Sequence, residues 1–511
     1  MGKGGGGGDG KKRSELQEVL ERYEPVVGVE VHAQLLSDTK AYCGCSSHYN
    51  PNIPNANICP VCTGEPGTLP VPNARVVELA SKAAMALQCE IAHEVRYDRK
   101  NYFYPDTPKN YQITQYTHPL GAGGCLELPS GRRVSITRLH VEEDSAKMVH
   151  QGSDSLAGST HSLVDFNRAG IPLAEIVSEP DMRSGAEAAE YGRELQKILR
   201  YVGASDGNMA EGSMRLDINV SIRPRGEEGL RPKVEVKNVN SFKSVQQAVD
   251  FEVVRQARAY DAGEVVRQET RMWDEKELAS KLMRVKEGES DYRYFPEPDV
   301  PPLALASSVV QAWRATLQEL PAAKRARYQD PAGLNLDAET TKFLTDDLAV
   351  ARFFEAAVEQ HGAEPKEAAK WLVGDIAGHL NGNKGRVKEF RKIKLTPGGL
   401  AELVDLIGQG NITGKIAKEL LPELLDEWEG GEEGAVLALV QARGLEAITD
   451  PAVIAALVQK VLEANPEKVE DFREGKTKLL GFFVGMVLKE SGSRANPEVV
   501  QSLTVEALNG A

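Results

Sequence analysis

The chain contains 511 residues, of which 41% are hydrophobic and 27% are charged, a composition typical of a globular protein with about two to four domains. It has no apolar run long enough to cross a membrane, and its N-terminus lacks the apolar core of a secretory signal. The net charge of −14 argues against a protein that coats nucleic acid through a general basic surface.

The chain is predicted to be an α+β protein with a tail and three domains. Residues 1–22, which begin MGKGGGGG, are expected to form a flexible glycine-rich tail. Residues 23–297 mix alternating strand patterns with glycine-rich turns, which favours a mixed or antiparallel sheet. Residues 298–395 begin with the proline-rich EPDVPPL, which is predicted to be a linker, and then have the apolar spacing of an all-helical domain. Residues 396–511 are expected to form a small helical C-terminal domain, with Thr396 as an N-cap.

The first strong pattern is a strand with a polar face. In VVGVEVHAQL, residues 26–35, Glu30 and His32 share one face because side chains alternate along a strand. Three further stretches repeat this arrangement. Their polar positions are Arg138, His140, Glu142, Arg215, Asp217, Asn219, Ser221, Glu235 and Lys237. One such face is more often merely solvated. Four faces rich in Glu, His, Arg, Asp and Asn favour a site for phosphates and a divalent cation, Mg²⁺ or also Mn²⁺.

Four of the six cysteines lie between these strands. The spacing Cys43-x-Cys45, thirteen residues, Cys59-x-x-Cys62 is that of a structural zinc site with four thiolate ligands. A redox pair is the weaker interpretation, because no thioredoxin-like strand and helix surround the motif, and a nucleophile is weaker still. The other two cysteines are expected to be incidental buried thiols.

Loops that combine aromatic and charged residues separate the strands. They cover residues 97–116, 164–181 and 291–299. Their aromatic side chains either pack beneath the loops or stack on bases, while neighbouring cations hold phosphates. Because three such loops accompany the polar strand faces, we expect them to enclose a polar binding cavity.

These residues resemble a known family. GVEVHAQL, DRKNYFYPDTPKNYQITQY, RLHVEEDSAK, DFNRAGIPLAEIVSEPD, EGSMRLDINVSIRP, EVKNVNSF and DYRYFPEPD are similar to motifs of the B subunits of tRNA-dependent amidotransferases. The resemblance covers about residues 24–511. It implies a cradle domain at 23–297 with a zinc knuckle at 43–62, a helical domain at 298–395, and a YqeY-like, tRNA-binding tail domain at 396–511.

The resemblance also implies an activity. ATP phosphorylates the side-chain carboxylate of Glu-tRNA(Gln) or Asp-tRNA(Asn), and ammonia then displaces the phosphate. The enzyme is thus a ligase that forms a carbon–nitrogen bond with glutamine as amido donor. The family's glutaminase, its A subunit, supplies the ammonia, and its C subunit completes a heterotrimer. A non-discriminating synthetase is a further candidate partner. A bacterial cytoplasm is expected, with a mature organellar protein as the secondary alternative. Which tRNA is used stays open.

The family's functional roles fall on particular residues of this chain. The magnesium ligands are Glu30, His32, Glu142 and Glu143, with Glu211 and Glu235 as further candidates. Contacts to phosphate or carboxylate are assigned to Arg138, Lys147, Arg215 and Lys237, and contacts to ATP to Asn219, Ser221 and Asn238. Adjacent strand residues point to opposite faces, so Glu142 and Glu143 can share one site only where their strand ends or bulges.

Two absences and one charge pattern complete the sequence evidence. The chain has neither a phosphate-binding loop of the G-x-x-x-x-G-K-[ST] type nor an evident glutaminase nucleophile, which implies a partner that makes ammonia. Basic residues gather in two short segments, where they form either solvated faces or contacts with tRNA. They are Lys384, Arg386, Lys388, Arg391, Lys392, Lys394, Lys476 and Lys478.

Two rival functions fit part of this evidence. A non-catalytic tRNA-binding scaffold explains the cysteines and helices but gives the acidic strand faces no role. A stand-alone ligase explains those faces but needs its own ammonia site. tRNA-dependent ATP hydrolysis, with amide formation from ammonium salt, separates the amidotransferase from both alternatives.

Overall fold

The structure is a computed structural model that describes residues 8–50, 52–152, 158–285, 292–382, 386–431 and 434–510, with side chains from Glu15 onward. The chain divides into two compact units, Met1–Leu320 and Pro321–Ala511. A sheet dominates the first unit and helices make up the second, so the predicted α+β class is confirmed. No helix among the described residues is long and apolar enough to span a bilayer.

A nine-stranded mixed sheet forms the centre of the first unit. Its order is β14-β13-β12-β11-β1-β10-β7-β6-β2, and the pairing is antiparallel except between β12 and β13. The strands are β1 (Tyr23–Gln34), β2 (Glu90–Ile91), β6 (Gly121–Glu127), β7 (Arg133–Glu143), β10 (Pro172–Ser178), β11 (Met214–Pro224), β12 (Val234–Val239), β13 (Glu269–Asp274) and β14 (Ala279–Val285). The first strand of the chain, β1, therefore lies between β10 and β11, which follow it by more than a hundred residues.

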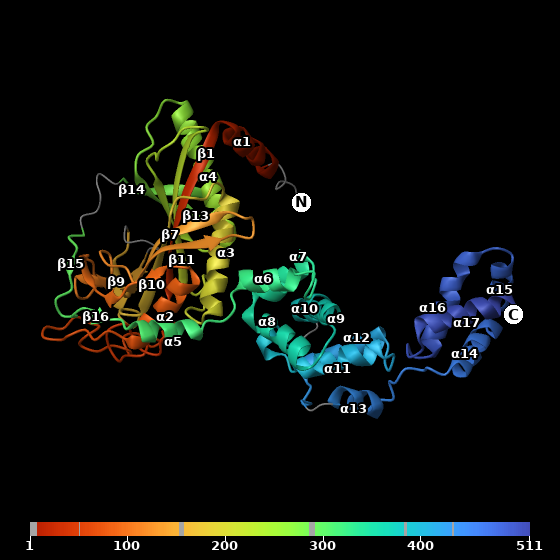
Figure 1. Cartoon of the computed structure of the whole chain (residues 1–511). Helices are drawn as coiled ribbons and strands as arrows, with labels where there is room; N and C mark the ends of the chain where they lie inside the picture. Colours follow the sequence, from red (N-terminus) through yellow and green to blue (C-terminus); the bar gives the residue numbers. More distant parts are fainter. Residues whose placement is uncertain are drawn as a thin grey trace. The chain divides into compact units, whose positions relative to one another are not determined.

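Helices cover one face of the sheet. α2 (Ala74–Ala86) contacts β7, and α3 (Gly185–Tyr201) and α4 (Phe242–Asp261) run along β1 and β11 (Figure 1). Ser184 and Ser241 begin the latter two helices, where their side chains accept backbone N–H bonds from the first turn. The apolar positions of the central strands meet these helices in one continuous hydrophobic core.

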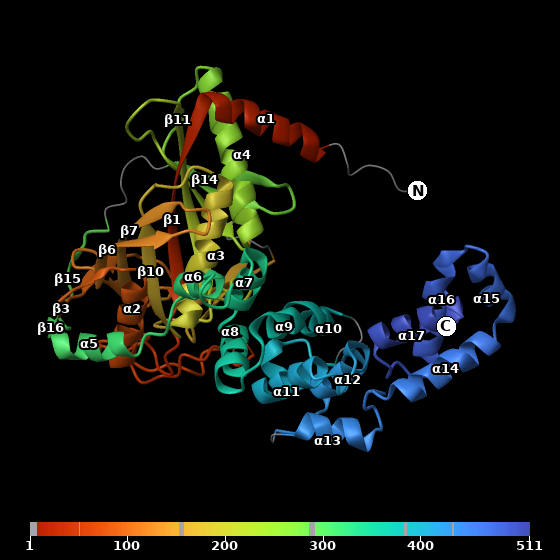
Figure 2. The same cartoon turned by 45° about the vertical axis from the view of Figure 1, so that its right-hand side comes forward.

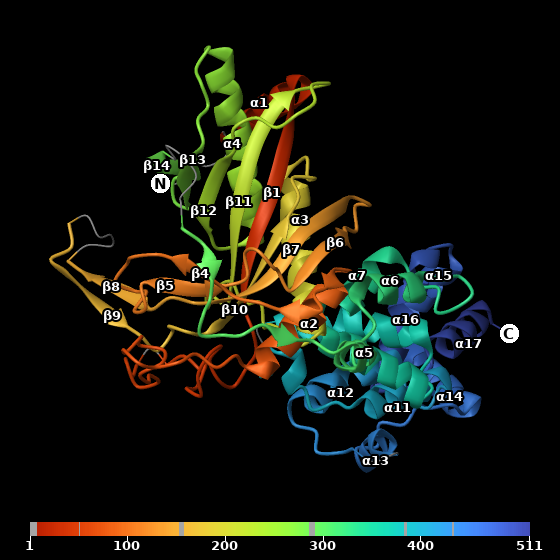
Figure 3. The same ribbon diagram turned by 60° about the vertical axis from the view of Figure 1, so that its left-hand side comes forward.

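Shorter strands and loops surround the main sheet, and Figure 3 shows β4, β5, β8 and β9 on the side of β10 away from α3. They form three small sheets that pair distant segments. Their strands are β3 (Glu94–Val95), β4 (Asp98–Asn101), β5 (Tyr111–Thr114), β8 (Lys147–Gln151), β9 (His161–Asp165), β15 (Phe295–Pro296) and β16 (Leu303–Ala304). β15 pairs with β4 and thereby brings the loop near residue 293 beside the loop near residue 103.

A helix replaces most of the predicted N-terminal tail. α1 (Gly8–Arg22) contacts α4, beside which it lies in Figure 2. Val19 is buried in the main core, and ion pairs join Glu15 to Arg258 and Arg22 to Asp261. A flexible tail is therefore wrong for residues 8–22, because the apolar face of this segment packs on α4; residues 1–7 lie outside the described residues.

The first unit extends beyond the predicted boundary at residue 297. β15 and β16 pair with β4 and β3, and Val310 and Trp313 of α5 (Ser307–Ala315) pack against the main core. The proline-rich stretch predicted as a linker therefore lies within the first unit, with Val300 buried in the main core, and the division falls at Leu320.

The second unit contains two separate hydrophobic cores, Tyr328–Val440 and Ile454–Leu508. The first of these cores crosses the domain boundary that was predicted between residues 395 and 396. Thr396 nevertheless caps its helix as predicted, by accepting a bond from Gly399 N. The elements are α6 (Pro321–Gln329), α7 (Ala338–Asp346), α8 (Leu348–Glu355), η1 (Ala356–Gln360), α9 (Pro365–Lys370), η2 (Trp371–Ile376), α10 (Ala377–Asn381), η3 (Phe390–Lys392), α11 (Pro397–Gly408), α12 (Gly414–Asp426), α13 (Ala435–Ala442), α14 (Pro451–Glu463), α15 (Pro466–Arg473), η4 (Thr477–Leu479), α16 (Leu480–Glu490) and α17 (Pro497–Asn509).

Replacing the buried side chain of α1 tests whether this helix is part of the fold. We expect Val19→Asp to detach α1, because an unpaired carboxylate would lie in the core, and amide hydrogen exchange in residues 15–22 should then become fast. The exposed neighbour provides the control: Glu18→Ala should leave the protection intact. Equal exchange in wild type and Val19→Asp would contradict the packing of α1.

Candidate active site

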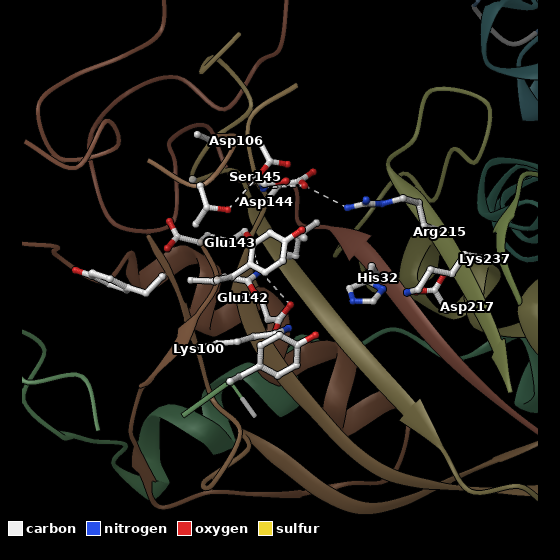
Figure 4. Close-up of a pocket in the computed structure, with 18 of the residues that line it drawn as sticks. His32, Lys100, Asp106, Glu142, Glu143, Asp144, Ser145, Arg215, Asp217 and Lys237 are labelled. Atoms are coloured by element: carbon white, nitrogen blue, oxygen red, sulfur yellow. Dashed lines mark hydrogen bonds and ion pairs between the residues drawn. The ribbon is translucent and has the colours of Figure 1, made fainter. Parts of the chain in front are cut away.

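A polar pocket of about 550 Å³ opens on the loop-covered face of the main sheet. Strands β1, β7, β11 and β12 supply one part of its lining, and the segment from Lys100 to Gln112 supplies another. Figure 4 shows the charged side chains from these elements gathered around one space. The charged lining residues are His32, Lys100, Asp106, Lys109, Glu142, Glu143, Asp144, Arg215, Asp217, Lys237 and Arg284.

A histidine and two carboxylates meet beside this pocket. His32 of β1 lies directly opposite Glu175 of β10, and their side chains are 3.2 Å apart. Glu175 in turn lies opposite His140 of β7, whose Nε2 is 3.5 Å from Glu175 and 3.3 Å from Glu142. The ligand atoms of His32, Glu142 and Glu175 all lie within 4.8 Å of one another. This set of donors could hold a metal ion.

Neighbouring cations keep the two buried carboxylates ionised. Burial raises the pKa of Glu142, but Lys100 and His140 outweigh burial and hold that pKa at about 2. Burial also raises the pKa of Glu175, while His140 and His32 hold it well below its usual range. Conversely, burial lowers the pKa of His140, and Glu175 and Glu142 raise it to about 9. The cluster is thus a compact group of paired charges near pH 7.

Three further cation–carboxylate pairs line the pocket. Lys237 is 2.7 Å from Asp217, Arg215 is 3.2 Å from Asp144, and Lys109 is 2.6 Å from Glu143. Burial alone would lower the pKa of Lys237, but Asp217 and Glu235 raise it well above its ordinary value. These cations could exchange their carboxylate partners for the phosphates of a ligand.

Glu142 and Glu143 lie where their strand ends, which is one of the two arrangements that allow adjacent strand residues to share a site. β7 ends at Glu143, and both side chains line the same pocket. They nevertheless have different partners. Glu142 accepts a bond from Thr114 and faces His140, whereas Glu143 accepts the backbone N–H of Ile113 and pairs with Lys109. Only Glu142 belongs to the cluster of possible metal ligands.

Several residues predicted for the site lie outside the pocket lining. Glu30 accepts a bond from Asn219, Ser221 is buried, Arg138 lies over the Tyr116 ring, and Glu235 accepts a bond from Thr270. Lys147 is exposed on β8 and Glu211 is exposed in a turn. Of the three residues predicted to contact ATP, only Asn238 lines the pocket; the remaining two are Asn219 and Ser221.

Sequence reasoning missed Glu175. β10 reads PLAEIVS and is almost wholly buried, so it lacks the alternation that marked the other strands. A single carboxylate within such an apolar strand is a signal in itself, because buried carboxylates are rare unless they are paired. Lys100, which is 3.4 Å from Glu142, was also missed, although it belongs to the aromatic and charged loops.

The four clustered cysteines come together as predicted. Their sulfur atoms lie within 4.8 Å of one another, and all four are free thiols. Cys62 receives the backbone N–H of Cys59 at 3.2 Å, and the Nζ of the fully buried Lys40 lies 3.6 Å from its sulfur. A hydrogen bond with Cys43, together with Lys40, lowers the pKa of Cys62 to about 4. The set therefore fits a tetrahedral metal ion held by thiolates.

The predicted basic segments are exposed but partly neutralised. Arg386 pairs with Glu427, Arg391 with Asp347, Lys392 with Glu389, and Lys476 with Asp471. Lys388 donates to a backbone carbonyl, while Lys394 and Lys478 are exposed, and Lys384 lies outside the described residues.

Comparisons with known proteins agree with this architecture. The family model of the GatB/GatE catalytic domain matches residues 25–311, and that of the GatB domain matches residues 352–508. The B subunit of the aspartyl/glutamyl-tRNA(Asn/Gln) amidotransferase of Synechococcus elongatus is 51% identical over 96% of this chain and 99% of its own length. The chain belongs to the family of amidotransferase B subunits.

Relatives from other sources show the same similarity. The corresponding B subunit of Acaryochloris marina is 50% identical over 96% of this chain and 98% of its own length. The chloroplastic/mitochondrial B subunit of the glutamyl-tRNA(Gln) amidotransferase of Physcomitrium patens is 50% identical over 97% of this chain and 87% of its own length. The predicted family resemblance is therefore confirmed. The residues matched by the catalytic-domain model include His32, Glu142 and Glu175.

Titration of His140 tests the charge balance of the cluster. We expect Glu175→Gln to lower the pKa of His140 from about 9 toward its ordinary value of 6.5, because the largest favourable charge is removed. The folded pKa of wild type lies above its unfolded value. His140 therefore stabilises the fold below about pH 6.5, and this contribution is lost as the pH rises through about 9.

The measurement is NMR of the imidazole signals with a chelator present. Glu179→Gln is the control, since Glu179 contacts Thr137 and is not among the possible metal ligands. An unchanged pKa of His140 in Glu175→Gln would contradict the arrangement.

Proposed function

We propose that this chain activates the side-chain carboxylate of Glu-tRNA(Gln) or Asp-tRNA(Asn) with ATP and joins it to ammonia, giving Gln-tRNA(Gln) or Asn-tRNA(Asn). The names of the relatives from Synechococcus elongatus and Physcomitrium patens support this class of substrate. The observation that carries the proposal is the cluster of His32, Glu142 and Glu175 beside a pocket lined by cations.

The chemistry explains why such a pocket is needed. A carboxylate is a poor acyl donor because its leaving group would be an oxide. Attack of a carboxylate oxygen on the γ-phosphorus of ATP gives an acyl phosphate and releases ADP. Ammonia then attacks the acyl carbon, and phosphate leaves as the carbon–nitrogen bond forms. Phosphoryl transfer needs chiefly positioning of the reactants and neutralisation of charge.

The residues of the cluster fit a divalent cation. Their donor atoms lie within reach of one ion, and the lowered pKa values of Glu142 and Glu175 leave both carboxylates ionised at neutral pH. Mg²⁺ prefers such oxygen ligands, and the imidazole also accommodates Mn²⁺. A cation bound there would neutralise the charge of phosphoryl oxygens. Among the predicted ligands we therefore retain His32 and Glu142, and we add Glu175.

The cations of the pocket are suited to hold the reacting groups. We assign Lys237 and Arg215 to the phosphates of ATP or to the substrate carboxylate, because both line the pocket and both are already paired with a carboxylate. Lys100 lies between Glu142 and the ring of Tyr292 and would orient the carboxylate of the substrate. Asn238, whose backbone has a φ of 62°, lines the same side and is the remaining candidate for a contact with ATP.

The chain acts as part of a larger enzyme. The relatives are named as B subunits of an amidotransferase, and we infer that a glutaminase partner, the A subunit, supplies ammonia from glutamine while the C subunit completes the complex. The exposed Lys394 and Lys478 support a tRNA contact in the helical part. We further propose that the four cysteines hold a structural Zn²⁺, which would order a loop that has few apolar residues of its own.

Loss of the cluster should abolish the synthetic reaction. We expect His32→Ala and Glu175→Gln, each assembled with its partner subunits, to lower the rate of Gln-tRNA(Gln) formation by at least about a hundredfold, because charge stabilisation of this kind supplies factors of that size. The assay supplies Glu-tRNA(Gln), ATP, Mg²⁺ and ammonium salt in place of glutamine, and measures both phosphate release and the amide product.

Two controls make this assay specific. Glu179→Gln should retain wild-type activity, and glutamine hydrolysis by the complex should persist in all variants. A scaffold would show no tRNA-dependent ATP hydrolysis even in wild type, whereas a stand-alone ligase would form product from glutamine without any partner. Full activity of Glu175→Gln would remove this residue from the proposed site.

Metal analysis tests the thiol cluster. We expect about one Zn²⁺ per chain in freshly purified wild type and almost none in Cys62→Ser, because a tetrahedral site rarely survives the loss of a thiolate ligand. Cys125→Ser is the matched control, since Cys125 is a buried free thiol outside the cluster. Absence of zinc from the wild-type protein, measured by mass spectrometry of the metals, would contradict the assignment.

A further inference from the structure

Exposed aromatic rings gather at one side of the pocket, and the site described so far gives them no role. Phe103 is 65% exposed and Tyr102 is 43% exposed, although large aromatic side chains are usually buried. Tyr102 also lines the pocket, as does the exposed Arg284. The guanidinium of Arg293 lies 5.2 Å from the centre of the Phe103 ring. We call Tyr102, Phe103, Arg284 and Arg293 the rim cluster.

Hydrogen bonds hold the two segments that carry Tyr102, Phe103 and Arg293. Tyr102 N donates to Asn110 O at 3.0 Å, which closes the loop that carries both aromatic rings. Arg293 has a φ of 46°, a left-handed conformation that side-chain-bearing residues rarely adopt. The side chain of Asn101 donates to the carbonyls of Tyr292 and Arg293 and so fixes this strained segment. Strain of this kind is retained mainly where it has a functional use.

A continuous series of contacts joins the rim cluster to the proposed reaction site. Lys100 is 3.4 Å from Glu142, and its Nζ lies 5.3 Å from the centre of the Tyr292 ring. Tyr292 lines the pocket and directly precedes Arg293. These contacts mark a path from Glu142 past Tyr292 to the rim cluster.

We propose that the rim cluster binds the unpaired 3′ nucleotides of the aminoacyl-tRNA. This inference rests on the proposed function. The reacting carboxylate is attached through the amino acid to the terminal ribose, so the nucleotides that precede it must lie at the mouth of the pocket. Tyr102 and Phe103 stack on bases, and Arg284 and Arg293 contact phosphates. Stacking accepts any base, so the cluster positions the substrate and does not read its sequence.

Kinetics of two variants test this assignment. We expect Phe103→Ala, in the assembled enzyme with ammonium salt, to raise the KM for Glu-tRNA(Gln) by about tenfold while kcat changes less than twofold, in keeping with the contribution of one stacked base. Arg293→Asn should also raise KM, because asparagine tolerates the left-handed backbone but lacks the cation. It should further reduce the slope of log Kd against log salt by about 0.7, the value for one phosphate contact with a single strand.

Phe295→Ala is the matched control. Phe295 is 44% exposed and has Arg99 5.8 Å from its ring centre, yet neither of its neighbours in the chain, Tyr294 and Pro296, lines the pocket, whereas Phe103 directly follows the pocket-lining Tyr102. Its KM should equal that of wild type. An equal rise of the KM for Glu-tRNA(Gln) in Phe103→Ala and Phe295→Ala would overturn the proposal. Loss of the partner subunits from Phe103→Ala in size-exclusion chromatography would also overturn it, because the ring would then belong to a protein interface.

Binding of a shortened tRNA separates this inference from the proposed function. Wild type should bind a tRNA that lacks its unpaired 3′ nucleotides more weakly than the intact molecule, and Phe103→Ala should lose most of this difference. If shortening the tRNA weakened binding equally in wild type and in Phe103→Ala, the proposed role of the rim cluster would be overturned. If the wild-type complex formed no amide at all, the proposed function would fail, while the comparison of intact and shortened tRNA would still decide the binding role.

Discussion

Two ionised carboxylates buried on one face of a sheet are the feature on which the site depends. Glu142 and Glu175 are 2% and 7% exposed, and an isolated carboxylate at such a position would cost several kcal/mol. Their burial is tolerated because His32, His140 and Lys100 surround them. This arrangement requires β1, β10 and β7 to be neighbours in a fixed register, with helices covering the opposite face of the sheet.

The same concentration of charge links the fold to the proposed reaction. A divalent cation and a phosphate chain would take over the interactions that the side chains now make with one another. The pocket is therefore organised before its substrates bind, and little rearrangement is needed when charge moves during phosphoryl transfer. The thiol cluster contributes Cys62 to the lining of the pocket, so an ion bound by the cysteines would support the shape of the site without taking part in the reaction.

Local sequence patterns predicted the strands better than the contacts between them. Alternation in β1 correctly placed Glu30 and His32 on one face, but only His32 joins the cluster, because register sets His32 opposite Glu175 and Glu30 opposite Val177. Register depends on pairing between segments more than a hundred residues apart, which no local pattern reveals. The close spacing of four cysteines, by contrast, was sufficient to predict their convergence.

The errors in the sequence-based description have related causes. The glycine-rich start of the chain concealed an amphipathic segment, and α1 is stabilised by a surface of α4 more than two hundred residues away. The linker was placed by its proline content and the boundary at 395/396 by the signal for a helix start, whereas hydrophobic cores are defined by packing. The basic segments were judged from formal charge, although acidic neighbours neutralise several of their members.

The transfer of an oxygen isotope tests the central claim most directly. If the chain activates the substrate as an acyl phosphate, Glu-tRNA(Gln) labelled with ¹⁸O in its side-chain carboxylate should pass one labelled oxygen to inorganic phosphate in each turnover. Mass spectrometry of the phosphate measures this transfer, with Glu175→Gln as the inactive control. Phosphate that carries no label from the substrate, formed together with Gln-tRNA(Gln), would contradict the proposed mechanism.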